Sequence, residues 1–435
     1  MNGFIEFINI VTTNILRNPP VLLGLIAALG LALQKKSLAE IIKGSFLTAF
    51  GMFILTTGVN LLAGTIVPIN SAFQNLAGAV AGVGLDDVSF TATYGGQVGL
   101  AMFFGLILHL VIARFTPFKV IFLTGHMIWW FPFIFVAAGV EGGLTGAPLV
   151  VFGSICSALY WSIMPWVLRK YVFDVTGDKS FTIGHPTGFL SLISGFVASK
   201  VGNKEKSTED LKLSPKLSFF REISITGCIV IIIMFIIVGF IAPDSILGEE
   251  AAAVGMGQLI FDVIINAITQ GITFGAGLVI MLQGVRMLIA QIVPAFKGIS
   301  EKLVPDAIPA FDCPILFNYK PNAVLIGFIV AMITSTILVL ICNAANLFGV
   351  VLIPLVITSF FECGAAAVIG EGQGGLKGSI IGTIVASVAM VAVVGISAVI
   401  YSGTIQNWML IFGGNDFSLF GTIAKLIAGL FGGLF

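Results

Sequence analysis

Uninterrupted apolar stretches recur along this chain of 435 residues and constrain its fold more than any other feature. A helix needs roughly 20 apolar residues to cross the hydrocarbon core of a bilayer, where every backbone polar group must be paired within the protein. Charged residues make up only 10% of the chain, whereas a soluble domain usually carries about a quarter. The sequence therefore predicts an all-α polytopic membrane protein, and its net charge of zero argues against a nucleic-acid partner.

The apolar stretches predict about eleven transmembrane helices. We place them at 20–34, 44–67, 98–114, 119–140, 147–168, 222–243, 262–293, 322–342, 347–370, 377–401 and 418–435. Lysine and arginine gather in every second break between these segments, and such residues stay on the cytoplasmic side of a membrane. We therefore expect a multi-pass protein of the bacterial cytoplasmic (inner) membrane, with its amino terminus outside and its carboxyl terminus in the cytoplasm.

Two segments from the two halves of the chain align without a gap. The segments 51–68 and 277–294 share two glycines, a Gly-Val pair and a final Ile-Val-Pro. The first begins on the predicted inside and the second on the predicted outside, so the repeat is inverted, as in many transporters with a midplane substrate site. We expect one membrane domain, with a first repeat at 1–168, a cytoplasmic linker with an amphipathic segment at 169–221, and a second repeat and last helix at 222–435.

The longest polar stretch of the chain, 170–220, contains a charged run that begins at Lys200. Such a run is typical of a solvated linker, and a docking site for a cytoplasmic partner is the alternative. The apolar part at 181–198 is broken by glycine and too short to span, so we expect an interfacial or re-entrant helix there.

Two Gly-His pairs interrupt apolar sequence, where polar groups are costly unless they are paired or functional. The first is Leu123-Thr-Gly-His126, in which the glycine leaves room for a ligand and the imidazole can bind an oxygen. The second is Phe181-Thr-Ile-Gly-His185, and the following Pro186 argues against a continuous helix and predicts a loop. A histidine bonded to a neighbouring carbonyl, or a purely structural loop, is the alternative. His109 lacks such polar company and is expected to be a packing residue.

Two acidic residues are further candidates for binding a polar solute. Asp312 lies in the segment 305–314, whose three prolines exclude a regular helix and predict a hairpin tip or re-entrant loop. A carboxylate at this place can accept hydrogen bonds from a polyol. Glu362 lies within a predicted span, which favours a functional role. The glycine-rich run at 370–375 lacks the residues of a phosphate loop and predicts a flexible connection with a solvated Glu371.

Gly58 and Gly284 are the repeat-related pair of glycines, and each lies within a predicted helix. Close helix packing is one explanation, and a broken helix that exposes backbone donors is the other. The 5 cysteines occur singly, without a CxxC pair or a zinc-ligand spacing, and the chain has no Walker A sequence. We therefore expect no metal, no cofactor and no ATP-driven pump.

Several short motifs, in order along nearly the whole chain, resemble the membrane component (enzyme IIC) of the ascorbate-type sugar phosphotransferase system (PTS). They are Asn18-Pro-Pro-Val-Leu-Leu-Gly24, Ile42-Lys-Gly44, Leu123-Thr-Gly-His126, Phe181-Thr-Ile-Gly-His185, Glu209-Asp-Leu-Lys-Leu213, Gln283-Gly-Val-Arg-Met287, Ala295-Phe-Lys-Gly-Ile-Ser300, Phe311-Asp-Cys313 and Pro321-Asn-Ala-Val324.

The resemblance implies a homodimer with re-entrant hairpins, in which a substrate-carrying core moves against a dimerisation domain as in elevator-type transporters. It implies a sugar, L-ascorbate or a related polyol or pentose, that is phosphorylated at the cytoplasmic face. The phosphoryl donor is then a cysteine of a separate enzyme IIB, which enzyme IIA supplies, and this chain carries no catalytic residue. By the family's pattern Gly58, His126, His185 and Asp312 lie at the sugar site.

The chain departs from the family's pattern at two positions. Trp130 stands where a glutamine follows the first histidine by four residues, and Pro186 stands where another glutamine directly follows the second. Two side-chain hydrogen-bonding groups expected for ascorbate are thus missing, so a polyol or pentose-like substrate that stacks on Trp129 or Trp130 is a rival to ascorbate. Two other classes of protein remain as alternatives: an ion-coupled symporter, in which Glu362 and Asp312 bind the ion, and a membrane receptor or channel.

Overall fold

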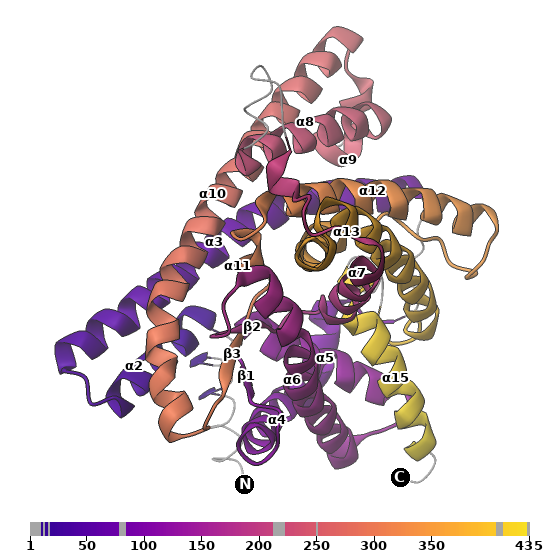
Figure 1. The fold of residues 1–435 in the computed structure, drawn as a ribbon. Coiled ribbons are helices and arrows are strands. Elements are labelled where there is room, and N and C mark those ends of the chain that lie inside the picture. The colour runs from indigo at the N-terminus through magenta and orange to yellow at the C-terminus, as the bar shows by residue number, and fades with distance from the viewer. Residues whose placement is uncertain are drawn as a thin grey trace.

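The computed structural model describes residues 10–11, 14–15, 18–77, 84–211, 222–248, 251–405 and 412–432. Its principal elements are α2 (Pro19–Leu33), α3 (Leu38–Ala77), α4 (Asp87–Phe115), β1 (Val120–Phe122), α5 (Gly125–Glu141), α6 (Gly146–Thr176), β2 (Thr182–Ile183), α7 (Gly188–Val201), η2 (Thr208–Asp210), α8 (Ile223–Ile241), α9 (Pro243–Leu247), η4 (Ala251–Ala253), α10 (Met256–Lys302), β3 (Ile308–Phe311), α11 (Pro314–Phe317), α12 (Pro321–Ala344), α13 (Val356–Ile400) and α15 (Asp416–Phe431). Helices therefore dominate the described chain, as expected of an all-α membrane protein (Figure 1).

Seven helices in the described ranges are long and apolar enough to cross a membrane: α3, α4, α6, α8, α10, α12 and α13. The predicted number of about eleven spans is not confirmed. The segments predicted at 20–34, 119–140 and 418–435 correspond to α2, α5 and α15, of 15, 17 and 16 residues. The prediction of one continuous span at 119–140 is wrong, because residues 120–122 form a strand before α5 begins.

Two long helices, α3 and α10, pack along one another and form an arm that also contains α2, α8 and α9 (Figure 1). Glycines permit the close approach, since a Cβ on Gly58 would lie 2.3 Å from the backbone nitrogen of Met281. The two contacts are reciprocal: Gly58 lies against the carbonyl of Gly277, and Gly284 lies against the carbonyl of Gly51. In the alignment of 51–68 with 277–294, Gly58 is equivalent to Gly284 and Gly51 to Gly277, so the two contacts are equivalent.

The remaining helices form a core around α7 and α13. The backbone of α13 is not helical at Gly374 and Gly375, and beyond this point the chain turns back, since Gly370 and Gly378 lie in backbone contact. The two legs of α13 thus correspond to the spans predicted at 347–370 and 377–401. The short helix α7 is largely buried against α13, which explains why a segment too short to cross a membrane is apolar.

The prediction of a solvated Glu371 is wrong. Its side chain is only 1% exposed and lies 3.5 Å from the ammonium group of Lys320. It also accepts hydrogen bonds from the hydroxyl of Ser207 (2.6 Å) and the backbone N–H of Thr208 (3.1 Å). The polar linker therefore docks on the turn of α13 before it leaves the described residues at Leu211.

A three-stranded parallel sheet lies between the arm and the core, in the order β1-β3-β2. The strands are short because the flanking sequence returns to helix, and prolines on either side of β3 prevent a helix there. This sheet could not be predicted from the sequence, because strands of two to four residues are too short to show a periodic pattern.

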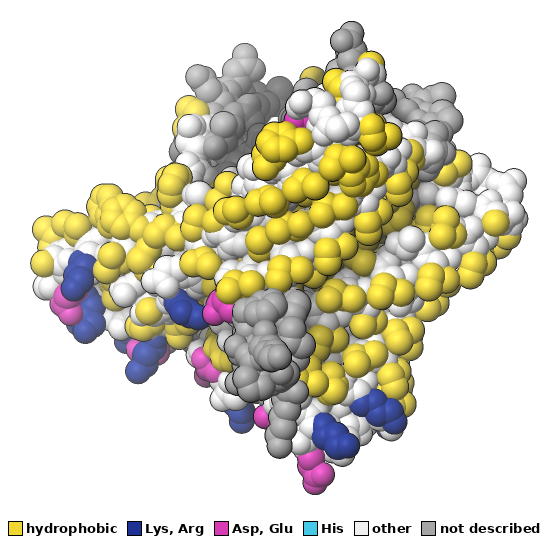
Figure 2. Space-filling model, turned by 90° about the horizontal axis from the view of Figure 1, so that it is seen from above, with side chains coloured by type: hydrophobic (Ala, Val, Ile, Leu, Met, Phe, Trp, Pro, Cys, Tyr) yellow, Lys and Arg dark blue, Asp and Glu magenta, His cyan; other side chains and the backbone are white. Residues whose placement is uncertain are grey.

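The outer surface is that of a protein immersed in lipid. Figure 2 shows a broad face covered by hydrophobic side chains, with charged side chains gathered toward one edge. Large apolar side chains are exposed on the long helices, for example Phe53 at 64%, Ile272 at 60% and Leu340 at 64%. A contiguous apolar surface of this kind requires an apolar environment.

Candidate functional site

The candidate site is built on the edge of the small sheet. His126 follows β1 by four residues, His185 follows β2 by two, and Asp312 follows β3 directly. Because the strands are parallel, their carboxyl ends meet at one edge, and the residues that follow them converge there. The backbone pairing continues past β2, since the N–H of Gly184 donates to the carbonyl of Phe311 (2.7 Å). Three segments far apart in sequence are thus fixed side by side.

Asp312 lies between the two histidines. Its Oδ2 is 3.7 Å from Nε2 of His126, and its Oδ1 is 3.5 Å from Nε2 of His185. Both separations exceed the usual hydrogen-bond length of about 2.7–3.2 Å. An oxygen atom to one side of an imidazole–carboxylate pair, about 2.8 Å from each group, can therefore bond to both, and a sugar hydroxyl supplies such an atom. The side chains of His185 and Asp312 are 6% and 11% exposed, whereas His126 is 38% exposed and gives access to the site.

These groups line a cavity of about 290 Å³ at the boundary between arm and core. Its lining residues are Val59, Ala63 and Val67 of α3, together with His126, Met127, Trp130, His185, Asp312, Pro314, Ile357, Phe361, Glu362, Phe412, Asn415 and Phe417. One wall thus belongs to the arm, and the polar groups all belong to the core. Five of the residues that the sequence singled out, His126, His185, Asp312, Glu362 and Trp130, meet in this one cavity.

Only one of the two candidate tryptophans lines the cavity, and Gly58 does not line it. Trp130 lines the cavity, whereas Trp129 is 7% exposed and packs in the hydrophobic core. Gly58 lies in the crossing of α3 and α10, one residue before the cavity-lining Val59. The packing explanation for Gly58 therefore accounts for its contacts, and α3 is continuous there.

Glu362 is 4% exposed and adds a second carboxyl group to the lining of the cavity. Its Oε1 accepts a hydrogen bond from Nδ2 of Asn415 (2.9 Å), whereas its Oε2 has no hydrogen-bond partner among the described residues. A buried acceptor without a partner is costly, so this oxygen is available to a ligand hydroxyl.

Sequence reasoning missed Asn415 and Asp416, which begin α15. The side chain of Asn415 accepts from the N–H of Phe417 (3.0 Å), and Asp416 is fully buried. The sequence does contain a pattern that indicates them, because Asn-Asp before an apolar run is typical of the start of a helix. His109 is the packing residue that the sequence predicted: it is buried, its Nδ1 lies 2.8 Å from Oγ of Ser162, and its Nε2 accepts from the N–H of Phe122 (3.0 Å).

The same trio is the only His, Cys, Asp or Glu cluster in the described ranges with the geometry of a metal site. His126, His185 and Asp312 each offer one ligand atom, and these atoms lie within 4.8 Å of one another. Two imidazoles and a carboxylate suit several divalent transition metals. The trio can therefore hold either a hydroxyl or a cation, and the two readings are separable by experiment.

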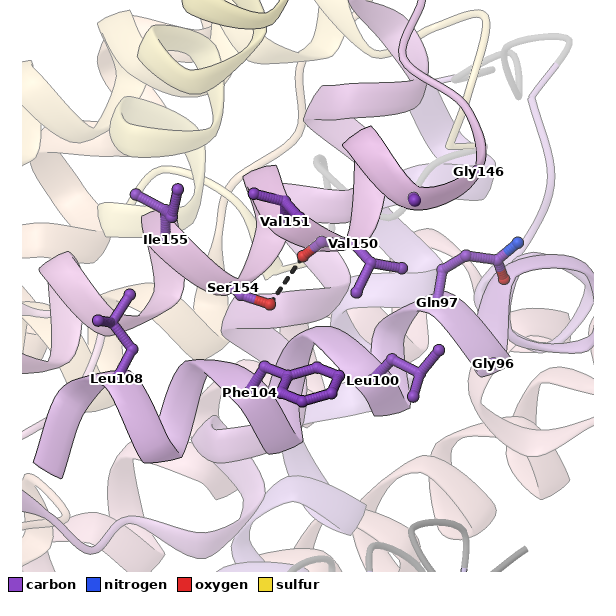
Figure 3. Close-up of a pocket in the computed structure, with 11 residues that line it drawn as sticks. Gly96, Gln97, Leu100, Phe104, Leu108, Gly146, Val150, Val151, Ser154 and Ile155 are labelled. Carbon is purple, nitrogen blue, oxygen red and sulfur yellow. Dashed lines mark hydrogen bonds between the residues drawn. The ribbon is translucent and has the colours of Figure 1, made fainter. Parts of the chain in front are cut away.

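A larger hollow of about 880 Å³ lies between α4 and α6 (Figure 3). Leu100, Phe104 and Leu108 of α4 face Val151 and Ile155 of α6 across it. Its one hydroxyl at mid-length, on Ser154, already donates to the carbonyl of Val150 (2.7 Å), as Figure 3 shows. Gln97 adds an amide at one end, and the remaining lining residues offer mainly apolar contact.

The fold and the site together define a polytopic membrane protein with a largely apolar cavity into which two histidines and two carboxyl groups project. The chain belongs to the family of PTS system sugar-specific permease components (EIIC-GAT), whose sequence model matches residues 14–416. A curated relative, the ascorbate-specific PTS system EIIC component of Mycoplasma pneumoniae (strain ATCC 29342 / M129 / Subtype 1), is 27% identical over 421 residues. The alignment covers 85% of this chain and 63% of that relative.

Proposed function

We propose that this protein is an enzyme IIC permease that carries a sugar across the bacterial cytoplasmic membrane while a separate enzyme IIB phosphorylates it. The substrate is L-ascorbate or a related polyol or pentose. The observation that carries the proposal is the convergence of His126, His185 and Asp312 on one cavity, where a sugar hydroxyl can bond to an imidazole and to the carboxylate. Membership of the family and the ascorbate-specific relative support it.

The chemistry of the lining favours the uncharged members of this substrate group. Two carboxylates, Asp312 and Glu362, face the cavity, and its lining residues include no lysine or arginine. Carboxyl groups accept hydrogen bonds from hydroxyls, and none of these lining residues is a lysine or arginine that could pair with an anion such as ascorbate. Trp130 supplies an aromatic face for the C–H surface of the sugar, in place of the amide that the family pattern has there. A neutral polyol or pentose therefore fits better than ascorbate.

The placement of the cavity supports transport by movement of the core. The polar groups all lie on core elements, whereas Val59, Ala63 and Val67 of the arm close one side with apolar surface. A rigid-body displacement of the core along the arm would carry the bound sugar and replace these neighbours, as in other repeat-built transporters. The reciprocal glycine contacts between α3 and α10 support an internal repeat and keep the arm itself close-packed. The arm is then the dimerisation domain of a homodimer surrounded by lipid.

The main alternative is an ion-coupled symporter, which the free Oε2 of Glu362 favours. A buried intramembrane carboxylate next to a substrate cavity is typical of proton and cation sites. In that case uptake would follow an ion gradient and would need no phosphoryl donor.

Reconstitution in proteoliposomes separates the two functions. With enzymes IIA and IIB supplied, the permease should deliver phosphorylated sugar. This uptake should require phosphoenolpyruvate and should not respond to ionophores. Uptake driven by a pH or sodium gradient without IIB would contradict the proposal. A binding screen of L-ascorbate, pentitols and hexitols on the purified protein identifies the substrate. No phosphoryl label should remain on this chain, because His126 and His185 bind sugar and the donor is the IIB cysteine.

A further inference from the structure

The carboxylate of Asp416, in the first turn of α15, is fully buried and receives three hydrogen bonds. Its Oδ1 accepts from the backbone N–H of Phe189 (2.9 Å). Its Oδ2 accepts from the backbone N–H of Gly188 (3.0 Å) and from the hydroxyl of Tyr160. Its own N–H donates to the carbonyl of Pro186 (2.9 Å). A residue near the end of the chain thus holds the backbone between Pro186 and Phe189.

These bonds supply a cap that α7 does not make for itself. The first N–H groups of a helix have no acceptor within it. The hydroxyl of Thr187, at the N-cap position, is engaged elsewhere: it donates to the carbonyl of Glu362 (2.7 Å) and lies 2.9 Å from Oγ of Ser191. Asp416 also places negative charge at the helix start, where it is favourable. Gly188 makes room, because a Cβ there would lie 2.5 Å from Oδ2 of Asp416.

His185 directly precedes the segment that Asp416 holds. The position of the His185 imidazole therefore depends on how the backbone is fixed on either side of it. Before His185, the sheet fixes Gly184. At His185 itself, the carbonyl lies 3.3 Å from the hydroxyl of Tyr160, whose single proton it shares with the closer Asp416. The imidazole has no side-chain hydrogen bond of normal length within the described ranges: Nδ1 is without a partner, and Nε2 lies 3.5 Å from Asp312.

We infer that Asp416 is a positioning residue that sets the place of the His185 imidazole in the cavity, with Tyr160 as its auxiliary. The inference rests on the proposed sugar site for its effect on binding. The contacts between Asp416 and the segment 186–189 do not depend on which substrate the protein binds.

The first test needs no ligand. Asp416→Asn keeps the shape of the side chain but places an amide group where hydrogen-bond donors converge. Hydrogen–deuterium exchange of the purified protein should show the amides of Gly188 and Phe189 exchanging about tenfold faster or more, while the amides of α4 keep their protection. Unchanged exchange in this segment would overturn the inference. If Asp416→Asn does not fold, Tyr160→Phe, which removes one donor and leaves the carboxylate, should show a smaller increase in the same segment.

The second test measures whether Asp416 acts through His185. The probes are L-ascorbate and xylitol, titrated onto the purified protein. Asp416→Asn should weaken binding of the tighter probe by about tenfold, which corresponds to one lost hydrogen bond. In a His185→Gln background, which keeps a hydrogen-bonding side chain, Asp416→Asn should change affinity by less than about twofold, because groups that act together are not additive. In a Trp130→Phe background it should keep its full effect.

A matched control separates positioning from general stability. Ser397→Ala removes a buried hydrogen bond to Ser418 of the same helix α15 (2.9 Å) without touching the segment 186–189. It should lower the melting temperature and leave affinity unchanged. Equal losses from Asp416→Asn in all three backgrounds would mean that Asp416 only stabilises the fold, and would overturn the inference. If neither probe binds the unaltered protein, the proposed function fails, and the exchange experiment still decides the role of Asp416.

Discussion

The imidazole of His126 and the carboxylate of Asp312 come from opposite halves of the chain and lie 3.7 Å apart. The sequence placed each of them beside a break in its own half and predicted that they share a substrate. The structure gives the reason for their approach, since β1 and β3 are neighbours in one parallel sheet.

Loss of either residue should weaken sugar binding. Asp312→Asn and His126→Ala should each reduce affinity by about ten- to a hundredfold, because a hydrogen bond that involves a charged group contributes roughly 1.5–3 kcal/mol. Titration calorimetry with the sugar found in the binding screen measures this loss.

The double variant Asp312→Asn/His126→Ala should lose less than the sum of the single losses, because neighbouring groups that share a ligand are coupled. Additive losses would mean that the two residues do not share it, and unchanged affinity in folded Asp312→Asn would place the site elsewhere. Chelation with EDTA should leave sugar binding intact; a strict dependence on a divalent ion would assign the trio to a metal.

Gly58→Ala should destabilise the arm, whereas Gly64→Ala on the same helix should not. A Cβ at Gly58 would overlap the backbone of Met281, and one at Gly64 would meet nothing within 4 Å. Overpacking of this kind costs about 1–3 kcal/mol, and alanine in an open helical position gains up to about 1 kcal/mol. Thermal unfolding in detergent compares the two variants. Equal melting temperatures would show that the close crossing of α3 and α10 is absent in the protein in solution.

Glu371→Ala should lower stability by roughly 2–4 kcal/mol, because it leaves Lys320 and the N–H of Thr208 without their buried acceptor. Lys320→Ala should cost less, about 1 kcal/mol, since Ser207 and Thr208 still donate hydrogen bonds to Oε1 of the carboxylate. The exposed pair Lys297–Glu301 is the control, and its loss should cost at most about 1 kcal/mol. A loss for Glu371→Ala no larger than for Glu301→Ala would contradict a docked linker.

The linker around Lys206 should face the cytoplasm, as the distribution of lysine and arginine predicts. A cysteine at Lys206, in a background without native cysteines, should react with a membrane-impermeant maleimide only after the cells are opened. A cysteine at Asp244, in a break predicted to be outside, should react in intact cells. The reverse pattern would invert the predicted topology.

The sequence alone determined the class of the protein and most members of its site. Apolar runs long enough to span a bilayer leave few folds open, and polar residues within such runs are conspicuous because lipid penalises them. His126, His185, Asp312 and Glu362 were found in this way, and they do meet in one cavity.

Only the tertiary structure decided how these residues meet and what holds them. The three short strands carry no periodic signal, so the sheet that brings His126, His185 and Asp312 together could not be read from the chain. Glu371 looked solvated because its neighbours are glycines, yet a linker from elsewhere in the sequence covers it. Asp416 likewise acts on a helix start that is far away in sequence. Hydrogen bonds between distant segments leave no local pattern, and for this reason burial of these carboxylates became visible only in the folded molecule.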